Sequence, residues 1–252
     1  MELIVVGAGP AYTDREGASG SAYLVRVGEA FLLLDLGQGS FPRLFRHVEP
    51  SGLLAVVVSH LHPDHYIDLV PLRHYLRFEF DPPRRVPVFG PSRLAERLDA
   101  LHAVPGFTAA SLDTIDVGVG HRSIGPVALE SALVLHTDES YAYRIAPAGS
   151  EEHTGLVYSG DCGRADDLEP LLQPGDVLLA EVSFGPGPVV PGAYHLDGPA
   201  IGRLANRCRV GRVLLTHLQM GFDPEATIRS VHDAGYEGPV ELVWPGSRAA
   251  ID

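Results

Sequence analysis

One run of six residues constrains this chain more than any other: His60-Leu61-His62-Pro63-Asp64-His65 gathers three imidazoles and a carboxylate. It follows the short, β-branched apolar segment 53–58, which predicts a buried strand closed by a proline-containing loop. On an extended turn, the alternate residues His60 and His62 can face one point. Asp64 and His65 can then face a second point nearby. Imidazoles and carboxylates that converge in this way are ligands of zinc-type sites, whereas burying them without partners is costly. The run therefore predicts a metal site at the C-terminal end of a strand.

The rest of the sequence predicts an α/β chain. Apolar runs bounded by glycine and proline predict strands at 3–6, 22–27, 31–35, 54–58, 86–89, 112–117, 127–135, 141–146, 155–160, 177–181, 213–216 and 240–243. Helices are predicted at 64–77, interrupted by Pro71, at 92–102, with Leu94, Leu98 and Leu101 inward, and after the capping residues Asp197 and Asp223. No linker or repeat divides the chain, so we expect a single domain, 1–252, with two β-layers flanked by helices.

Charge and cysteine content limit the classes of partner. The formal net charge is −13 and all nineteen basic residues are arginine, which argues against binding of long nucleic acids. The two cysteines, Cys162 and Cys208, are too few for a disulfide framework. The N-terminal residues 1–6 predict a strand and not a signal peptide, and no apolar run approaches the roughly 20 residues that span a bilayer. We therefore expect a cytoplasmic protein with no membrane association.

Three further polar residues end apolar strands, where a rigid scaffold can present metal ligands. His136 follows Leu133-Val134-Leu135, Asp161 follows the strand predicted at 155–160, and His217 follows the strand at 213–216. Each alone is more typical of a cap or loop residue. Together with His60, His62, Asp64 and His65 they number seven, which is enough for two metals if Asp161 bridges them.

This ordered set of motifs resembles the metallo-β-lactamase superfamily over nearly the whole chain. Asp35, in Asp35-Leu36-Gly37, resembles the early Asp of that superfamily, which supports the metal loop from behind. The resemblance implies a four-layer αββα sandwich with two divalent metal ions. One ion would take His60, His62 and His136, the other Asp64, His65 and His217, with Asp161 between them. Zinc is favoured by these ligands, with manganese or iron left open.

The same resemblance indicates a hydrolase. His65 and the lack of a bridging cysteine favour the dinuclear hydrolases over true β-lactamases, and two metals would generate a bridging hydroxide near neutral pH. The segments 180–183 and 194–197 resemble those of ribonuclease Z. That likeness implies that Glu181 orients His195, which would act as general acid or stabilise the developing phosphorane charge. The expected catalytic residues are Asp64, Glu181 and His195.

Departures from ribonuclease Z bear on the substrate. Only a short stretch, 137–160, stands where that enzyme carries its basic tRNA-binding arm, and Asp68 and Ala180 replace a Gly and a His of its motifs. The sequence thus favours a phosphodiesterase for a small phosphodiester, a cyclic nucleotide or short RNA. The alternatives are a thioester or lactone hydrolase with the same metals, and a non-catalytic metal-binding domain. A homodimer, common in the superfamily, is left open.

The remaining polar residues carry no predicted site. A cluster of arginines interrupted by Glu79 and Asp81 predicts a solvated helix end: Arg73, Arg77, Arg84 and Arg85. The segment 7–10 lacks the helix that a dinucleotide loop requires. Cys162 is expected to pack beside Asp161. The other histidines are predicted at the surface, at positions 47, 74, 102, 121, 153 and 232.

Overall fold

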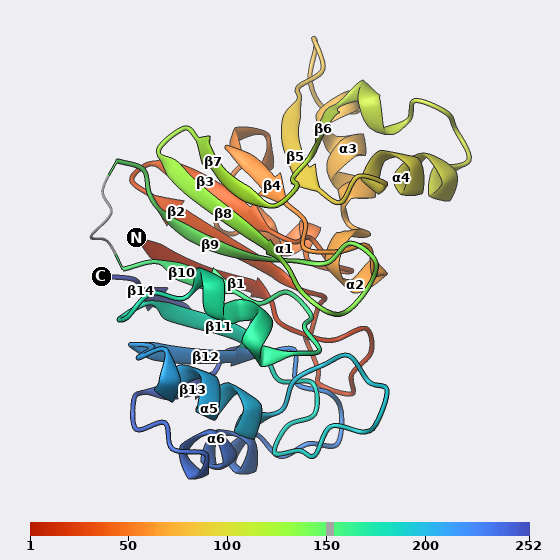
Figure 1. Ribbon diagram of the computed structural model, residues 1–252. Coiled ribbons are helices and arrows are strands. Elements are labelled where there is room, and N and C mark those ends of the chain that lie inside the picture. The colour runs from red at the N-terminus through yellow and green to blue at the C-terminus, as the bar shows by residue number, and fades with distance from the viewer. Residues whose placement is uncertain (150–153) are drawn as a thin grey trace.

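The computed structural model describes residues 1–149 and 154–252, in which two seven-stranded sheets pack face to face and carry helices on their outer faces (Figure 1). This is the predicted four-layer αββα arrangement. The two ends of the chain lie side by side, and the amide of Ile251 donates to Met1 O at 2.9 Å. No helix among the described residues has the length and apolarity to cross a membrane.

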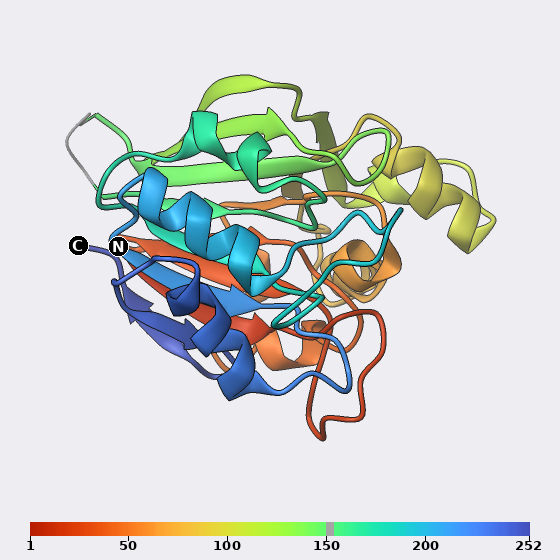
Figure 2. The ribbon, with the colours of Figure 1, turned by 60° about the horizontal axis from the view of Figure 1, so that its bottom comes forward.

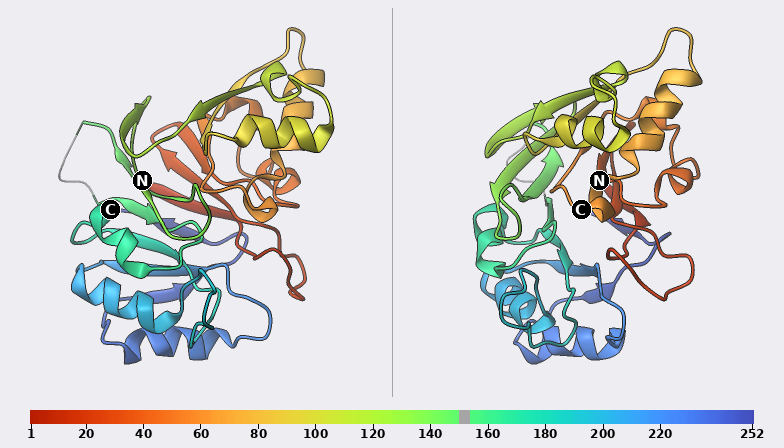
Figure 3. Two further views of the ribbon diagram at one scale, coloured as in Figure 1. Left: turned by 45° about the vertical axis from the view of Figure 1, so that its right-hand side comes forward. Right: turned by 90° about the vertical axis from the view of Figure 1, so that its right-hand side faces the viewer.

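The first sheet takes its strands from the N-terminal half and from the C-terminus. Its order is β14 (Arg248–Ala250), β1 (Glu2–Gly7), β2 (Ala22–Val27), β3 (Ala30–Leu34), β4 (Ala55–Val57), β5 (Val86–Gly90) and β6 (Leu112–Asp116), with β3 to β6 parallel. On its outer side lie α1 (Phe41–Leu44), α2 (Pro63–Tyr66), α3 (Leu69–Phe78) and α4 (Leu94–His102), with the short 3-10 turns η1 (Pro50–Gly52) and η2 (Thr108–Ala110). Figure 3 shows α3 and α4 projecting at one end of the molecule.

The second sheet comes from the C-terminal half. Its order is β13 (Val240–Leu242), β12 (Arg212–Thr216), β11 (Val177–Glu181), β10 (Leu156–Tyr158), β9 (Tyr141–Pro147), β8 (Val127–Leu133) and β7 (Gly120–Ile124), with β10 to β13 parallel. The 3-10 segment η3 (Ala165–Leu171) and the helices α5 (Gly198–Arg207) and α6 (Pro224–Asp233) cover its outer face (Figure 2). Asp197 and Asp223 cap these two helices as predicted, accepting hydrogen bonds from the amides of Ala200 and Ala226.

Three apolar clusters hold the layers together. The central cluster lies between the sheets and includes Tyr23, Leu34, Tyr143 and Leu179, each fully buried. The other two clusters lie under the helices of the first and of the second sheet. Because the parallel strands of each sheet end at one edge, residues that follow β3, β4, β10, β11 and β12 are brought to a common rim.

Most predicted elements are confirmed, and the differences have local causes. The helix predicted at 64–77 divides at Ile67 and Asp68, while Pro71 lies in the first turn of α3, where it costs no hydrogen bond. The strands β7 and β14 were not predicted, because β7 is largely exposed and polar and β14 is very short. Leu101 is wrongly predicted as inward: it is 53% exposed, because the last turn of α4 extends past β5 and β6.

The prediction that the four arginines of the cluster are solvated is wrong for Arg73. Arg73 is buried, donates from Nε to Phe107 O at 2.8 Å and lies over the Phe107 ring. The other three arginines of the cluster are exposed as predicted. Among the histidines predicted at the surface, positions 102, 121 and 232 are exposed, positions 47 and 74 are half-buried, and position 153 lies outside the described residues.

Candidate metal centre

The six-residue run forms the loop between β4 and α2, and Asp35 anchors it from below. Asp35 Oδ2 accepts hydrogen bonds from His65 Nδ1 at 2.7 Å, Ser59 Oγ at 2.7 Å and Tyr158 OH at 2.6 Å. Its Oδ1 accepts from the Ser59 amide at 2.6 Å. All four residues are fully or almost fully buried. One carboxylate thus ties the metal loop of the first sheet to a strand of the second, at the position predicted for a supporting Asp.

Four predicted ligands converge in the interior: Asp64, His65, Asp161 and His217. His217 Nε2 lies 3.3 Å from His65 Nε2 and 3.2 Å from Asp64 Oδ2. His65 Nε2 is 3.7 Å from the same Asp64 oxygen. All four residues are buried. We call Asp64, His65 and His217 the buried half of the centre.

The other predicted ligands form a second group beside it. His136 Nε2 lies 3.0 Å from His62 Nδ1, and the ring of His60 is 4.7 Å from that of His62 and 4.8 Å from that of His136. His60 is buried, but His62 is exposed to solvent. We call His60, His62 and His136 the open half of the centre.

Asp161 lies between the halves and turns one oxygen to each. Its Oδ2 is 3.8 Å from His60 Nε2 and 3.6 Å from His136 Nε2. Its Oδ1 is 3.3 Å from His65 Nε2 and 3.5 Å from His217 Nε2. This is the placement predicted for a bridging carboxylate. Gly160, directly before Asp161, lies against Ser59 of the metal loop, where a Cβ would come within 3.0 Å of the Ser59 Cβ.

The spacings and the unpaired atoms both fit a pair of metal ions. A tetrahedral ion with bonds of about 2.0–2.1 Å holds its ligand atoms roughly 3.3 Å apart, and the distances between facing ligand atoms run from 3.0 to 3.8 Å. Among the described residues, the buried atoms His60 Nε2 and Asp161 Oδ1 have no hydrogen-bond partner. Buried polar atoms are normally satisfied, and the lone pairs of these two atoms fit bonds to a metal ion.

Hydrogen bonds at the far side of each ring set which nitrogen faces the centre. His136 Nδ1 donates to Tyr194 O at 2.7 Å, and His65 Nδ1 donates to the Asp35 carboxylate. Both acceptors carry no proton, so the Nε2 atoms of these rings are left with lone pairs. His60 Nδ1 contacts Ser59 Oγ at 3.1 Å, and because that hydroxyl donates to Asp35 it can accept from His60. His217 Nδ1 contacts Ser183 Oγ at 3.1 Å.

Electrostatics favour neutral imidazoles in the open half and an ionised carboxylate at Asp161. Burial, reinforced by the charge of His65, lowers the pKa of His60 well below its ordinary value. Burial also lowers the pKa values of His62 and His136. For Asp161 burial opposes ionisation, but the charges of His217 and His65 outweigh it and hold its pKa well below the usual range. Burial alone would lower the pKa of His65, but the charges of Asp161 and Asp35 outweigh burial and raise that pKa well above the ordinary value. In the open half, neutral imidazoles beside an ionised carboxylate are a metal-ligating set.

The backbone is strained at two of these positions. Asp35 and His217 adopt φ values of 57° and 59°, a left-handed conformation uncommon for residues other than glycine. Gly37 permits the close approach of the two segments, because a Cβ there would lie 1.8 Å from Asp64 O. The surrounding contacts therefore hold Asp35 and His217 in this conformation. The close contact with Asp64 explains why the third residue of the Asp-x-Gly segment is glycine.

Glu181 and His195 form a pair at the rim of the centre. Glu181 Oε1 accepts from His195 Nδ1 at 3.0 Å and from the Leu196 amide at 3.0 Å, while Oε2 accepts from the Ser183 amide at 2.8 Å. Burial alone would lower the pKa of His195, but the hydrogen bond and charge of Glu181 outweigh it and raise that pKa. Glu181, His195 and His217 lie close enough to hold a metal ion, but the Glu181 oxygens already accept these hydrogen bonds, which fits the predicted role of orienting His195.

A cavity of about 330 Å³ opens over the centre. Its lining includes His62, Asp161, His195 and His217. Tyr12, which is 70% exposed, also lines the cavity. The cavity gives a small molecule access to both halves of the centre.

Several supporting residues were not predicted. Ser59, Ser183 and Tyr158 hold the ligands or Asp35, yet nothing in their spacing distinguishes them from ordinary strand residues. Only the position of Ser59, directly before His60, could have indicated a supporting role from the sequence. Cys162, expected to pack, is buried and contacts Arg164 O at 3.1 Å, and burial raises the pKa of its thiol. It has no contact that would make it a ligand.

Comparison with known proteins gives consistent relatives. The family model described as the β-lactamase superfamily domain matches residues 33–218. Uncharacterized protein ML1173 of Mycobacterium leprae is 35% identical over 235 residues, covering 90% of this chain and 80% of that protein. Ribonuclease Z of Mycobacterium bovis is 26% identical over 271 residues, covering 96% of this chain and 95% of that protein.

The probable metallo-hydrolase YhfI of Bacillus subtilis matches in both sequence and structure. It is 27% identical over 259 residues, covering 98% of this chain and all of that protein. The crystal structure of YhfI, described as a metallo-β-lactamase fold protein, superposes with a TM-score of 0.86 at 24% identity and covers 98% of both chains. At that identity the superposition supports the fold alone.

Proposed function

This chain belongs to the β-lactamase superfamily of metallo-hydrolases, and from that premise we propose that it is a dinuclear metal-dependent phosphodiesterase. Its substrate would be a small phosphodiester, a cyclic nucleotide or a short RNA. The observation that carries the proposal is the Glu181–His195 pair. His195 lies 3.9 Å from Asp161 and lines the same cavity, and Glu181 holds it from behind. A metal site without this pair would serve many hydrolyses equally well.

The open half and the buried half would each hold one divalent ion, with Asp161 shared between them. Zinc is the ion that best suits three imidazoles with a carboxylate. When bound, two such ions lower the pKa of a water molecule and polarise the scissile group. Asp35 keeps His65 in the tautomer and orientation that ligation needs, and Asp64 adds an anionic ligand beside it.

His195 would act as the general acid. With its Nδ1 proton held by Glu181, the ring can use Nε2 to donate to a leaving oxygen in the cavity. The His195 side chain is only about 20% exposed, which limits its exchange with bulk water. Glu181 is a positioning residue in this scheme, because it contacts His195 and not the substrate.

The cavity over the centre supports a nucleotide-sized substrate. Its volume of about 330 Å³ is within the range of small-molecule sites, and the exposed ring of Tyr12 offers a surface on which a base can stack. Residues 137–149 form a turn and β9, with no arm for a large RNA. The net charge of −13 also disfavours a long polyanion. Two free cysteines agree with the expected cytoplasmic location.

The direct test is hydrolysis of an aryl phosphodiester by metal-stripped protein before and after zinc or manganese is added back. We expect turnover only with metal, at a stoichiometry of about two ions per chain. Full metal loading without turnover would reject the phosphodiesterase and favour the thioester or lactone hydrolase. Turnover that persists after rigorous metal removal would reject metal-dependent chemistry altogether.

A variant of the general acid separates catalysis from metal binding. In His195→Gln we expect unchanged metal content and a fall of about 10²–10⁴-fold in kcat, the usual contribution of a positioned acid. An alkyl leaving group depends more on protonation than an aryl one, so kcat should fall more for a substrate with an alkyl leaving group. His121→Gln, an exposed histidine paired with Glu130, is the matched control. Equal losses with both leaving groups would contradict the assignment.

A further inference from the structure

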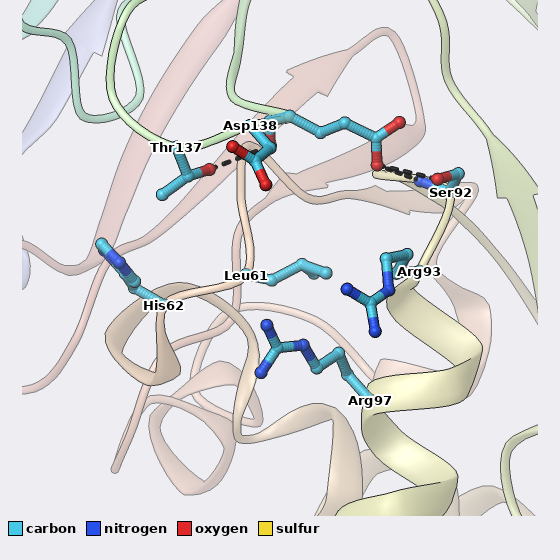
Figure 4. A pocket seen from close by; sticks show the side chains of 8 residues that line it. Leu61, His62, Ser92, Arg93, Arg97, Thr137 and Asp138 are labelled. Carbon is cyan, nitrogen blue, oxygen red and sulfur yellow. Dashed lines mark hydrogen bonds between the residues drawn. The ribbon is translucent and has the colours of Figure 1, made fainter.

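A second cavity, of about 240 Å³, lies on the other side of His62 from the catalytic cavity. Figure 4 shows its two walls: Arg93 and Arg97 extend from α4 toward Leu61, and Thr137 and Asp138 stand across from them. His62 lines both cavities. A molecule whose reacting group lies at the metal centre can therefore extend past His62 into this space.

The arginine wall has the character of an anion site. Arg93 and Arg97 are four residues apart at the start of α4, so their side chains are neighbours on one helix face, and like charges at this spacing are mildly destabilising. Arg93 is paired with Glu96 through bonds of 3.0 and 2.8 Å, but among the described residues Arg97 forms no ion pair. The charge of Glu96 acts on both arginines, so the two guanidinium groups together keep one net positive charge on this wall, which suits a phosphate group.

The opposite wall provides hydrogen-bond acceptors. Glu139 already accepts from the amide and hydroxyl of Ser92, at 2.9 and 2.8 Å. Asp138 is exposed beside it, facing the cavity (Figure 4). A ligand here would place an anion against the arginines and a hydroxyl or amino donor against Asp138. A nucleotide has both groups.

We propose that this cavity binds a second nucleotide of a linear substrate, with its phosphate against Arg93 and Arg97 and its sugar or base donors toward Asp138. The inference rests on the proposed phosphodiesterase function and narrows it. The preferred substrate is a short oligonucleotide that carries at least one phosphate besides the one that is cleaved. A cyclic mononucleotide has no such group and leaves this cavity empty.

The test compares three linear substrates that differ only in an added phosphate: the dinucleoside monophosphate ApA, its 5′-phosphorylated form pApA and its 3′-phosphorylated form ApAp. We expect kcat/KM for one phosphorylated form to exceed that for ApA by about 10–100-fold, the usual effect of hydrogen bonds to a charged group. In Arg97→Gln this ratio should fall close to one. In Arg229→Gln, which removes an arginine with an i−4 glutamate partner from α6, it should stay at the wild-type value.

Binding to the metal-stripped protein tests the subsite without catalysis. The phosphorylated dinucleotide should bind more tightly than ApA, and the difference should be lost in Arg97→Gln. Equal affinity and equal kcat/KM for all three substrates would overturn the subsite but not the proposed phosphodiesterase function. A preference for the phosphorylated form that persists in Arg97→Gln would do the same. A preference in binding without hydrolysis of any of them keeps the subsite and overturns the proposed function.

Discussion

The two halves of the metal centre differ in how firmly the chain holds them. Each residue of the buried half is shielded from solvent, and His65 is anchored by the buried carboxylate of Asp35. The partners in the open half are neutral: His60 contacts the Ser59 hydroxyl, His136 is held by a backbone carbonyl, and His62 is exposed. A charged, buried anchor orients a ligand more strongly than a neutral one. The comparison suggests one tightly retained ion and one that exchanges and meets the substrate.

The largest expected effect comes from the residue that the halves share. In Asp161→Asn the amide must turn a donor toward one group of imidazoles, so one half loses an anionic ligand whichever way the side chain lies. We expect metal content to fall to about one ion per chain or less, with loss of nearly all metal-dependent turnover. Metal analysis after dialysis measures the metal content, and the aryl phosphodiester assay measures the turnover. Asp113→Asn, an exposed pair with Arg85, is the control.

Removing a ligand of the open half should affect one ion only. In His62→Ala we expect loss of about one metal per chain, because the remaining ligands of the open half no longer complete the coordination shell. The buried half should retain its ion, since His62 lies outside the Asp64, His65, Asp161 and His217 group. Retention of both ions in His62→Ala would show that the open half is wrongly assigned. His121→Ala controls for the loss of an exposed imidazole.

The same division explains how much of this site the sequence could reveal. The ligands from His60 to His65 lie in one loop, so their convergence is visible as a local pattern. His136, Asp161 and His217 could be proposed only because each ends a strand and because the ordered set resembles a known superfamily. Which oxygen of Asp161 faces which half could not be predicted, because it depends on how the two sheets pack.

The fold shows the same limit. Long apolar strands and capped helices were predictable from local pattern, whereas β7 forms because β8 pairs with it and not because of its own residues. Arg73 lies in a charged segment but is buried by Phe107, which is distant in the sequence. In both cases the structure depends on contacts between residues distant in the sequence, which a local sequence pattern does not reveal.

The anchor of the buried half can be tested without touching a ligand. In Asp35→Asn one of the donors from Ser59, His65 or Tyr158 must face an amide NH₂ group in a buried site. We expect the affinity of the more tightly held ion to fall about 10–100-fold, as for other residues that orient a metal-bound histidine. Titration with a competing chelator measures the affinity. An unchanged affinity of that ion would remove Asp35 as the source of the asymmetry.

The smallest effect should come from the neutral partner on the same half. Ser183 Oγ lies 3.1 Å from His217 Nδ1 and 3.2 Å from His195 Nδ1, so Ser183→Ala removes a hydroxyl from both rings. A neutral hydrogen bond contributes about 1 kcal/mol, which predicts a loss of only about 5-fold in affinity for the tightly held ion. The chelator titration used for Asp35→Asn ranks the two variants directly. If Ser183→Ala costs as much as Asp35→Asn, charge at the anchor is not what distinguishes the halves, and burial of the ligands must account for the difference instead.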